Sequence, residues 1–176
     1  MKKILTLCGS VRKNSTNHRL INAIKEMCAS ELEIVMYDRL DSLPHFNPDI
    51  EDVLLPEQLL EFKQLLRLSD GVLICTPEYA HGVPGVLKNA IDWTVSSCEF
   101  SHKPTALITA STDGRFAHAS LIETLRVIEA EAIDELELLI PFAQTKISRE
   151  GKITDEQTAK AIEVLMRKFV AHVNGK

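Results

Sequence analysis

The chain has 176 residues, of which 45% are apolar, and it carries a formal net charge of −5. This length predicts one domain, residues 1–176, with enough apolar side chains to bury a core without disulfides or a structural metal. The mildly acidic balance argues against broad contact with nucleic acid or an anionic membrane surface, which requires a basic footprint, and no apolar run approaches the length of a membrane span.

Short apolar runs alternate with segments of helical periodicity along the chain. In order, we predict a strand at 3–8, a helix at 17–29, a strand at 33–36, an irregular segment at 37–56, a helix at 56–68, a strand at 72–76, a helix at 84–95, a strand at 105–109, a helix at 117–131, a strand at 136–140 and a helix at 154–173. Such alternation is typical of a parallel sheet with helices on both faces. Periodicity alone leaves a flavodoxin-like strand order and a truncated dinucleotide-binding fold open.

The loop after the first strand, residues 9–17, has the composition of a phosphate site. It offers three hydroxyls, one amide and one guanidinium, from Ser10, Ser15, Thr16, Asn17 and Arg12. The N–H groups and the dipole of the following helix favour an anion at this position. An ordinary helix cap rich in Ser and Asn is the alternative.

Spacing excludes three other phosphate loops. A P-loop requires a second glycine before a Lys-Ser/Thr pair, and the dinucleotide fingerprint requires three glycines, whereas this loop has only Gly9. A cysteine phosphatase loop would place arginine six positions after Cys8, where Asn14 stands. A hydroxyl-rich loop around a terminal monophosphate, as in FMN, remains.

The loop after the third strand, residues 77–83, suits a flat ring. Pro77 stiffens the strand exit, and Gly82 permits close approach of the backbone. We expect the loop N–H groups to face the polar edge of a heterocycle, and Tyr79 to flank the ring or a subunit interface. His81 is a candidate substrate contact, although a plain polar loop residue is the favoured interpretation.

Two motifs in these loops resemble the NADPH-dependent FMN reductase family, which includes NAD(P)H:quinone, chromate and azo-dye reductases. The first motif is Gly9-Ser10-x-Arg12-x-x-Ser15-x-Asn17-x-x-Leu20, and the second is Pro77-Glu78-Tyr79-x-x-Gly82-x-Pro84-Gly85-x-Leu87-Lys88-Asn89-x-Ile91-Asp92-Trp93. The resemblance implies an α/β, flavodoxin-like fold, a five-stranded parallel sheet in the order 2-1-3-4-5 with helices on both faces.

The resemblance also implies the cofactor-binding residues. The FMN phosphate would be held by Ser10, Arg12, Ser15, Thr16 and Asn17; the isoalloxazine ring would be lined by Pro77, Glu78, Tyr79, Ala80, His81, Gly82 and Ser111. The chain departs from the family at Ala80, where asparagine is usual, and at Arg115, Phe116 and His118, where the family loop is small and glycine-rich.

The implied function is FMN-dependent electron transfer from NADPH or NADH to a small acceptor such as a quinone, an azo compound or free flavin. No catalytic side chain and no metal are expected, because the cofactor carries the chemistry. An FMN-binding electron carrier without reductase activity is the main alternative, and a phosphate-ester hydrolase is a weaker one. The family also implies a homodimer or homotetramer, with residues 86–95 as a candidate apolar contact.

Single residues complete the sequence predictions. Cys8 and Cys75 fall in predicted strands and are expected to be buried and inert, a usage that fits a reducing cytoplasm. Lys88 and Asp92 are four residues apart on one predicted helix and can pair. Trp93 is either a core residue or part of a subunit surface.

Overall fold

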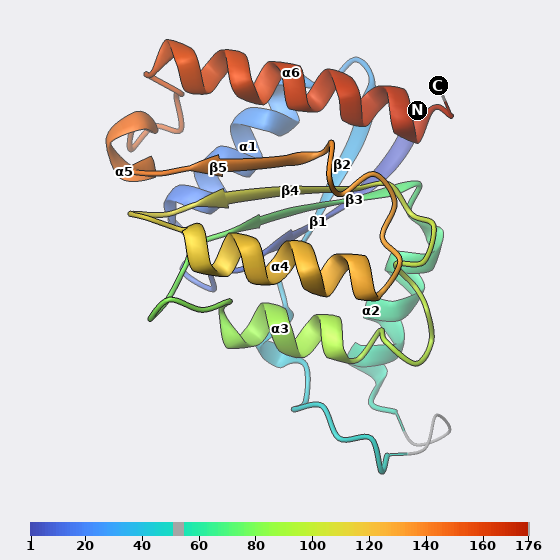
Figure 1. The fold of residues 1–176 in the computed structure, drawn as a ribbon. Coiled ribbons are helices and arrows are strands. Elements are labelled where there is room, and N and C mark those ends of the chain that lie inside the picture. Colours follow the sequence, from blue (N-terminus) through green and yellow to red (C-terminus); the bar gives the residue numbers. More distant parts are fainter. Residues whose placement is uncertain (51–54, 176) are drawn as a thin grey trace.

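The protein folds around one parallel sheet with helices on both faces (Figure 1). The computed structural model describes residues 1–50 and 55–175. The elements are β1 (Lys2–Cys8), α1 (Thr16–Met27), β2 (Leu32–Tyr37), a 3₁₀ turn (Leu40–Ser42), α2 (Glu57–Leu68), β3 (Gly71–Thr76), α3 (Gly85–Asp92), β4 (Thr105–Ala110), α4 (Arg115–Val127), β5 (Glu137–Ile140), α5 (Ala143–Lys146) and α6 (Glu156–Val173).

The strand order is β2-β1-β3-β4-β5, and all four neighbouring pairs are parallel. This confirms the flavodoxin-like order over the truncated dinucleotide-binding fold. After β1 the chain adds β2 on one side of it, and all later strands are added on its other side, beginning with β3. The loops that follow β1 and β3 therefore diverge at the carboxyl edge of the sheet. Ligands of open α/β sheets bind at such a point.

Each central strand is apolar on both sides because each side faces a separate core. Ile4 and Cys8 of β1 pack into the core under α1 and α6, whereas Leu5 and Leu7 pack into the core under α2, α3 and α4. Strands buried on both faces lack the polar–apolar alternation of half-exposed strands, as the sequence of β1 indicated.

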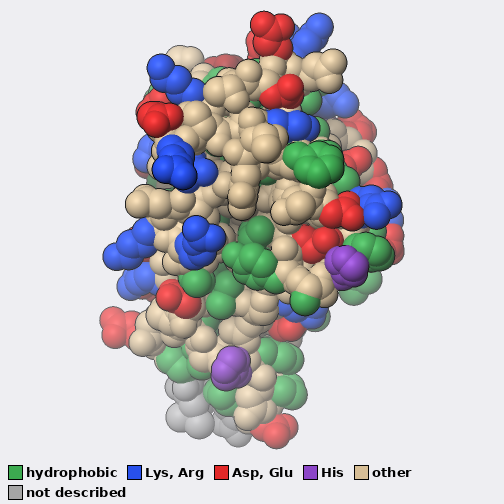
Figure 2. All heavy atoms as spheres, turned by 90° about the vertical axis from the view of Figure 1, so that its left-hand side faces the viewer, with side chains coloured by type: hydrophobic (Ala, Val, Ile, Leu, Met, Phe, Trp, Pro, Cys, Tyr) green, Lys and Arg blue, Asp and Glu red, His purple; other side chains and the backbone are tan. Residues whose placement is uncertain are grey.

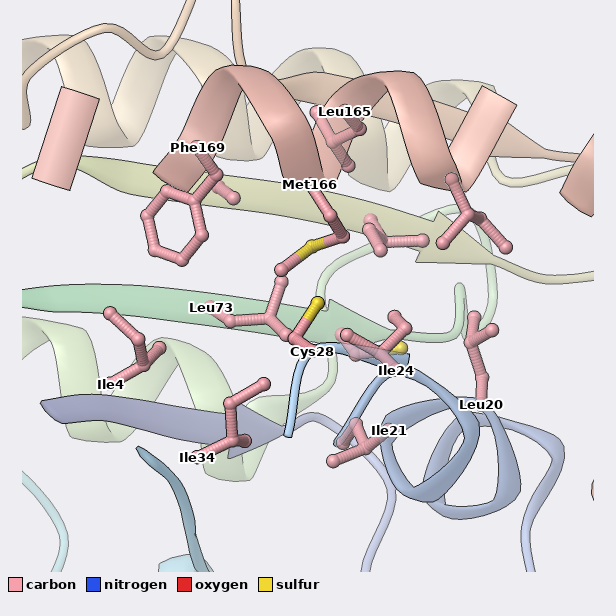
Figure 3. Packing of buried hydrophobic residues seen from close by; sticks show 14 of the residues in the cluster. Ile4, Leu20, Ile21, Ile24, Cys28, Ile34, Leu73, Leu165, Met166 and Phe169 are labelled. Carbon is pink, nitrogen blue, oxygen red and sulfur yellow. The ribbon is translucent and has the colours of Figure 1, made fainter. Parts of the chain in front are cut away.

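The core under α1 and α6 consists of interlocking aliphatic side chains (Figure 3). Leu20, Ile21 and Ile24 of α1 and Leu165, Met166 and Phe169 of α6 all reach the sheet, where Ile4, Ile34 and Leu73 lie. These side chains are at most 4% exposed. The spacing of three and four residues along both helices accounts for the shared apolar face.

The segment after β2 is held against α3 rather than left free. The Pro44 carbonyl accepts hydrogen bonds from Asn89 Nδ2 at 2.9 Å and from Trp93 Nε1 at 2.8 Å, and Phe46 N–H donates to Asn89 Oδ1 at 2.8 Å. Trp93 is 4% exposed and is therefore a core residue rather than part of a free surface. The predicted irregular segment 37–56 includes residues 51–54, which lie outside the described residues.

Several boundaries differ from the predictions. Helix α4 begins two residues earlier than predicted and ends at Val127, four residues before the predicted end, and α3 ends at Asp92 instead of residue 95. The four-residue helix α5 was not predicted, because a single turn gives no periodic signal. Lys88 and Asp92 form the expected pair at 2.6 Å.

Candidate functional site

A cleft of about 250 Å³ opens at the carboxyl edge of the sheet, between the loops that follow β1, β3, β4 and β5. Figure 2 looks onto this end of the molecule, where several Lys and Arg side chains gather along the left side of the view and acidic side chains lie on both sides. The cleft is lined by Ser10, Arg12, Ser15, Thr16, Asn17, Pro77, Glu78, Tyr79, Ala110, Ser111, Thr112, Ala143 and Gln144.

The first wall is the start of α1. Ser15 is the N-cap residue, and its Oγ accepts the His18 N–H at 3.1 Å. Thr16 Oγ1 accepts a hydrogen bond from Arg19 Nη2 at 3.1 Å, and Arg19 Nη1 donates to the Asn14 carbonyl at 2.8 Å. Arg19 therefore braces the loop from outside, and the Thr16 hydroxyl proton stays available to the cleft.

Gly9 lets the β1 loop leave the sheet beside β3. A Cβ atom built on Gly9 would lie 2.0 Å from Thr76 Oγ1, and Gly9 N–H donates to the Cys75 carbonyl at 3.0 Å. Any side chain at this position would push the loop away from β3. The glycine therefore fixes the first wall of the cleft against the second.

Asn17 lines the cleft but also ties three elements together. Its Nδ2 donates to the Ala110 carbonyl at the end of β4 at 3.1 Å, and its Oδ1 accepts from Cys75 Sγ at 3.2 Å. At 3% exposure it is largely committed to the fold. One amide N–H remains for a ligand, because an amide nitrogen carries two donors.

Arg12 supplies the positive charge of the cleft. It is exposed, and across residues 1–50 and 55–175 no carboxylate lies within ion-pairing distance of its guanidinium. A planar guanidinium that is not neutralised by the protein suits a phosphate or carboxylate.

Glu78 joins the β3 loop to the start of α4. Its Oε2 accepts N–H groups of Phe116 and Ala117, both at 2.8 Å, and its Oε1 accepts that of Gly114 at 3.3 Å. The carboxylate thereby pairs with the free N–H groups and the positive dipole end of α4. Although Glu78 lines the cleft, its carboxylate oxygens accept these N–H groups, which offset part of its negative charge.

Ser111 links the same two loops from the other side. Its Oγ accepts the Glu78 N–H at 3.2 Å, which leaves the hydroxyl proton free to donate into the cleft. Tyr79 N–H donates to the Gly82 carbonyl at 3.1 Å. The N–H groups of Glu78 and Tyr79 thus have protein partners, so these two give no support to the prediction that the loop N–H groups face a ring edge.

Residues 79–82 form a tight turn beside the cleft. Gly82 N–H returns a 2.9 Å hydrogen bond to the Tyr79 carbonyl, and the two central residues, Ala80 and His81, have φ values of 49° and 58°. Positive φ at both positions defines a type I′ turn, which favours Asn and Gly. The His81 ring stacks on Phe116 at 4.3 Å.

The cleft gathers most, but not all, of the predicted ligand residues. Ser10, Arg12, Ser15, Thr16, Asn17, Pro77, Glu78, Tyr79 and Ser111 lie in its walls, whereas Ala80, His81 and Gly82 lie in the adjoining turn. Their contact with a ligand stays a prediction.

Four lining residues were missed by the sequence predictions: Ala110, Thr112, Ala143 and Gln144. The last two belong to α5, whose start is tied to the β4 loop by hydrogen bonds from Phe142 N–H to the Thr112 carbonyl and from Ala143 N–H to the Ser111 carbonyl, both 3.0 Å. Because they follow the fifth predicted strand, the rule that ligands gather at carboxyl ends could have indicated them.

Cys8 and Cys75 are buried thiols, as predicted. Burial raises the pKa of Cys8 to about 11 and raises that of Cys75 well above its ordinary value, so both stay protonated at neutral pH. In the described part of the chain, no three His, Cys, Asp or Glu side chains are grouped to hold a metal ion, and no helix is long and apolar enough to cross a membrane.

The donor set fits FMN. Hydroxyls of Ser10 and Thr16, the Arg12 guanidinium and the N-terminus of α1 suit a phosphate, and Pro77, Tyr79 and Ser111 of the β3 and β4 loops line the rest of the cleft. Tyr79 Oη lies 3.4 Å from Ser10 Oγ, so the aromatic and phosphate-binding walls meet directly.

Comparison with known proteins agrees with this geometry. Residues 2–145 match the family described as NADPH-dependent FMN reductase. A 2-hydroxy-1,4-benzoquinone reductase of Burkholderia sp. is 31% identical over 180 residues, covering 99% of this chain and 97% of the relative. An NAD(P)H-dependent FMN reductase of Pseudomonas aeruginosa is 31% identical over 167 residues, covering 92% of this chain and 89% of the relative.

A solved structure agrees over the same length. The flavoenzyme NAD(P)H:(acceptor) oxidoreductase FerB from Paracoccus denitrificans superposes with a TM-score of 0.88 at 31% identity, covering 99% of this chain and 98% of the other.

Proposed function

We propose, from the premise that this chain belongs to the NADPH-dependent FMN reductase family, that its cleft binds FMN and that it reduces quinone or flavin acceptors with NAD(P)H. The observation that carries the proposal is the meeting, in one cleft beside Tyr79, of hydroxyl groups, a helix N-terminus and an arginine that pairs with no carboxylate of the described residues. Two similar proteins are named for FMN or quinone reduction, which supports the same reaction.

The chemistry that bound FMN supplies is the passage of electrons from a reduced nicotinamide to an acceptor. The residues of this chain would bind and orient the cofactor. Arg12 and the Ser10, Ser15 and Thr16 hydroxyls would hold the phosphate, with Asn17 fixing the helix that carries two of them.

The opposite wall would hold the ring. Pro77 and Tyr79 would lie along it, and Ser111 would donate its free hydroxyl proton to a polar ring atom. Glu78 would act indirectly, because its carboxylate holds the β3 loop against the start of α4. No side chain in the described part of the cleft is needed as a general acid or nucleophile.

The experiment compares FMN binding and turnover in two arginine variants. Arg12→Gln should weaken FMN binding by about tenfold, the value of one charge-assisted hydrogen bond, whereas Arg167→Gln on α6 should leave it unchanged. The FMN-loaded wild-type protein should oxidise NADPH or NADH when a quinone is present. A protein that takes up no FMN, or binds it without oxidising either nicotinamide, would contradict the proposal.

We also propose that the chain is a single cytoplasmic domain that acts as a homodimer or homotetramer. The free state of all four cysteines supports a reducing compartment. The candidate contact at residues 86–95 gives less support than its sequence indicated, because Leu87, Ala90 and Ile91 are buried in the core of the same chain. Light scattering of the purified protein would give the subunit number; a monomer would contradict the assembly.

A further inference from the structure

His18 lies one turn into α1 and faces back toward the cap of its own helix. Its Nδ1 is 2.8 Å from Ser15 Oγ and 3.4 Å from Cys8 Sγ. The same Ser15 oxygen accepts the His18 backbone N–H at 3.1 Å. His18 therefore contacts Ser15 twice, once through the main chain and once through the ring.

Ser15 carries one hydroxyl proton, and the direction of that proton matters to the cleft. Ser15 lines the cleft and is 7% exposed. A hydroxyl has one donor and two acceptor sites, and the His18 N–H already occupies one acceptor site. When Nδ1 of a neutral ring accepts, the proton points at His18. When Nδ1 is protonated it donates, and the hydroxyl proton is free to point elsewhere.

We propose that His18 is a positioning residue for phosphate binding: Nδ1 of the neutral ring accepts a hydrogen bond from the Ser15 hydroxyl, and protonation of Nδ1 reverses this bond and frees the hydroxyl to donate into the cleft. Binding of a phosphate group then takes up a proton at His18. The inference rests on the proposed function, because it concerns the same phosphate wall.

The charges around His18 fit a ring that is neutral until the phosphate arrives. Burial is the larger influence and lowers the pKa of His18, and Asp38, which follows β2, partly opposes it. Lys13 from the loop and Asp41 from the 3₁₀ turn line the adjoining cavity of about 360 Å³, so charges of both signs face the ring from that side.

Cys8 does not titrate together with His18, although its S–H lies within reach of the same Nδ1 lone pair at the longer distance of 3.4 Å. Its pKa of about 11 keeps the thiol protonated over the range in which histidine titrates. A bound phosphate places negative charge beside the cap and favours the imidazolium form, so the pKa of His18 rises on binding. His18 should therefore strengthen FMN binding increasingly as the pH falls.

The test measures FMN and riboflavin affinity from about pH 5.5 to about pH 8 in three proteins. These are the wild type, His18→Gln and the matched control His102→Gln, an exposed histidine at the amino end of β4. The second ionisation of a phosphate ester lies at about pH 6 and acts in the opposite direction, so the informative quantity is the ratio of variant to wild-type Kd.

For FMN, the ratio of the His18→Gln Kd to the wild-type Kd should rise by about tenfold toward low pH. The same ratio should not change with pH when riboflavin replaces FMN, or when His102→Gln replaces His18→Gln. Ser15→Gly removes the hydroxyl at little cost to the stability of the helix N-terminus. When the protein carries Ser15→Gly, adding His18→Gln should change the pH dependence of the FMN Kd less than it does in the wild type. Equal FMN pH profiles in wild type and His18→Gln, or an effect of equal size on riboflavin, would overturn the inference.

A second readout needs no flavin. The pKa of His18 followed by NMR should rise when inorganic phosphate is added. An unchanged His18 pKa would overturn the inference even where FMN binds. A protein that responds to phosphate but takes up no FMN would instead overturn the proposed function alone.

Discussion

Glu78 shows how one side chain can serve a ligand site without touching the ligand. Its carboxylate accepts three backbone N–H groups at the start of α4, from a loop that follows β3. The resemblance placed Glu78 only among the residues that would line the flavin ring, and the sequence did not indicate this partner, since residues 78 and 117 are far apart in the chain and only the fold brings them together.

Substituting Glu78 should therefore lower stability and flavin affinity together. Glu78→Gln removes the charge that compensates the helix dipole and should cost about 1 kcal/mol in the free energy of unfolding. Urea unfolding with parallel FMN titration measures both effects. Glu163→Gln, an exposed residue paired with Arg167 on α6, should change neither by more than about 0.5 kcal/mol. Equal effects of the two variants would contradict the assigned role.

Ala80 is strained where the resembling family usually carries asparagine. Its φ of 49° is in the left-handed region, as is that of His81 at 58°. Left-handed backbone costs an alanine about 1 kcal/mol, and asparagine tolerates it better. The sequence indicated a missing side-chain amide at this position; the structure adds that the departure also strains the turn.

Ala80→Asn should raise the free energy of unfolding by about 0.5 to 1 kcal/mol. The matched control is Ala119→Asn, at an exposed position of α4, where helix propensity predicts a loss of about 0.5 kcal/mol. Thermal unfolding measures both variants: the melting temperature should rise for Ala80→Asn and fall for Ala119→Asn. A destabilised Ala80→Asn protein would show that the turn does not have the strained geometry described.

At the scale of elements, Asp70 joins the starts of β1 and β3. Its Oδ2 accepts the Lys3 N–H at 2.7 Å, its Oδ1 accepts from Lys2 Nζ at 3.0 Å, and its own N–H donates to the Lys3 carbonyl at 2.8 Å. The Lys3 hydrogen bond is the main cause that lowers the pKa of Asp70 below 3.8, and Lys2 adds to it.

A carboxyl group with a lowered folded-state pKa stabilises the protein at pH values above its unfolded-state pKa, and this stabilisation is lost as the pH falls through the folded-state pKa. Asp70→Asn should therefore be less stable than wild type near neutral pH, with the gap closing as the pH falls below 3.8. Urea midpoints across this range provide the check. A gap that stays constant with pH would mean that the Asp70 charge is not what matters.

Strands were predicted more accurately than helix ends and connections. All five strands lie within a residue or two of the expected ranges, because runs buried on both faces leave a strong apolar signal. The ends of α3 and α4 were placed too late because apolar residues such as Val95 continue the helical pattern past the last helical turn. Helix α5, which adds Gln144 to the cleft, is too short for any periodicity to reveal.

At the scale of the molecule, two cores hold the sheet rigid and leave its carboxyl edge free for a ligand. Alternation of strands and helices predicted the layers, but only the resemblance of two loops to a family predicted the order β2-β1-β3-β4-β5, since strand order depends on contacts that periodicity does not encode. The same order brings the β1, β3 and β4 loops together and so creates the cleft.

A crystal structure of the protein grown with FMN tests the central claim most directly. The account predicts that the phosphate lies against Ser10, Arg12 and Thr16 at the start of α1, with the ring between Tyr79 and Ser111. A flavin bound elsewhere on the molecule, or one whose phosphate points away from α1, would contradict it.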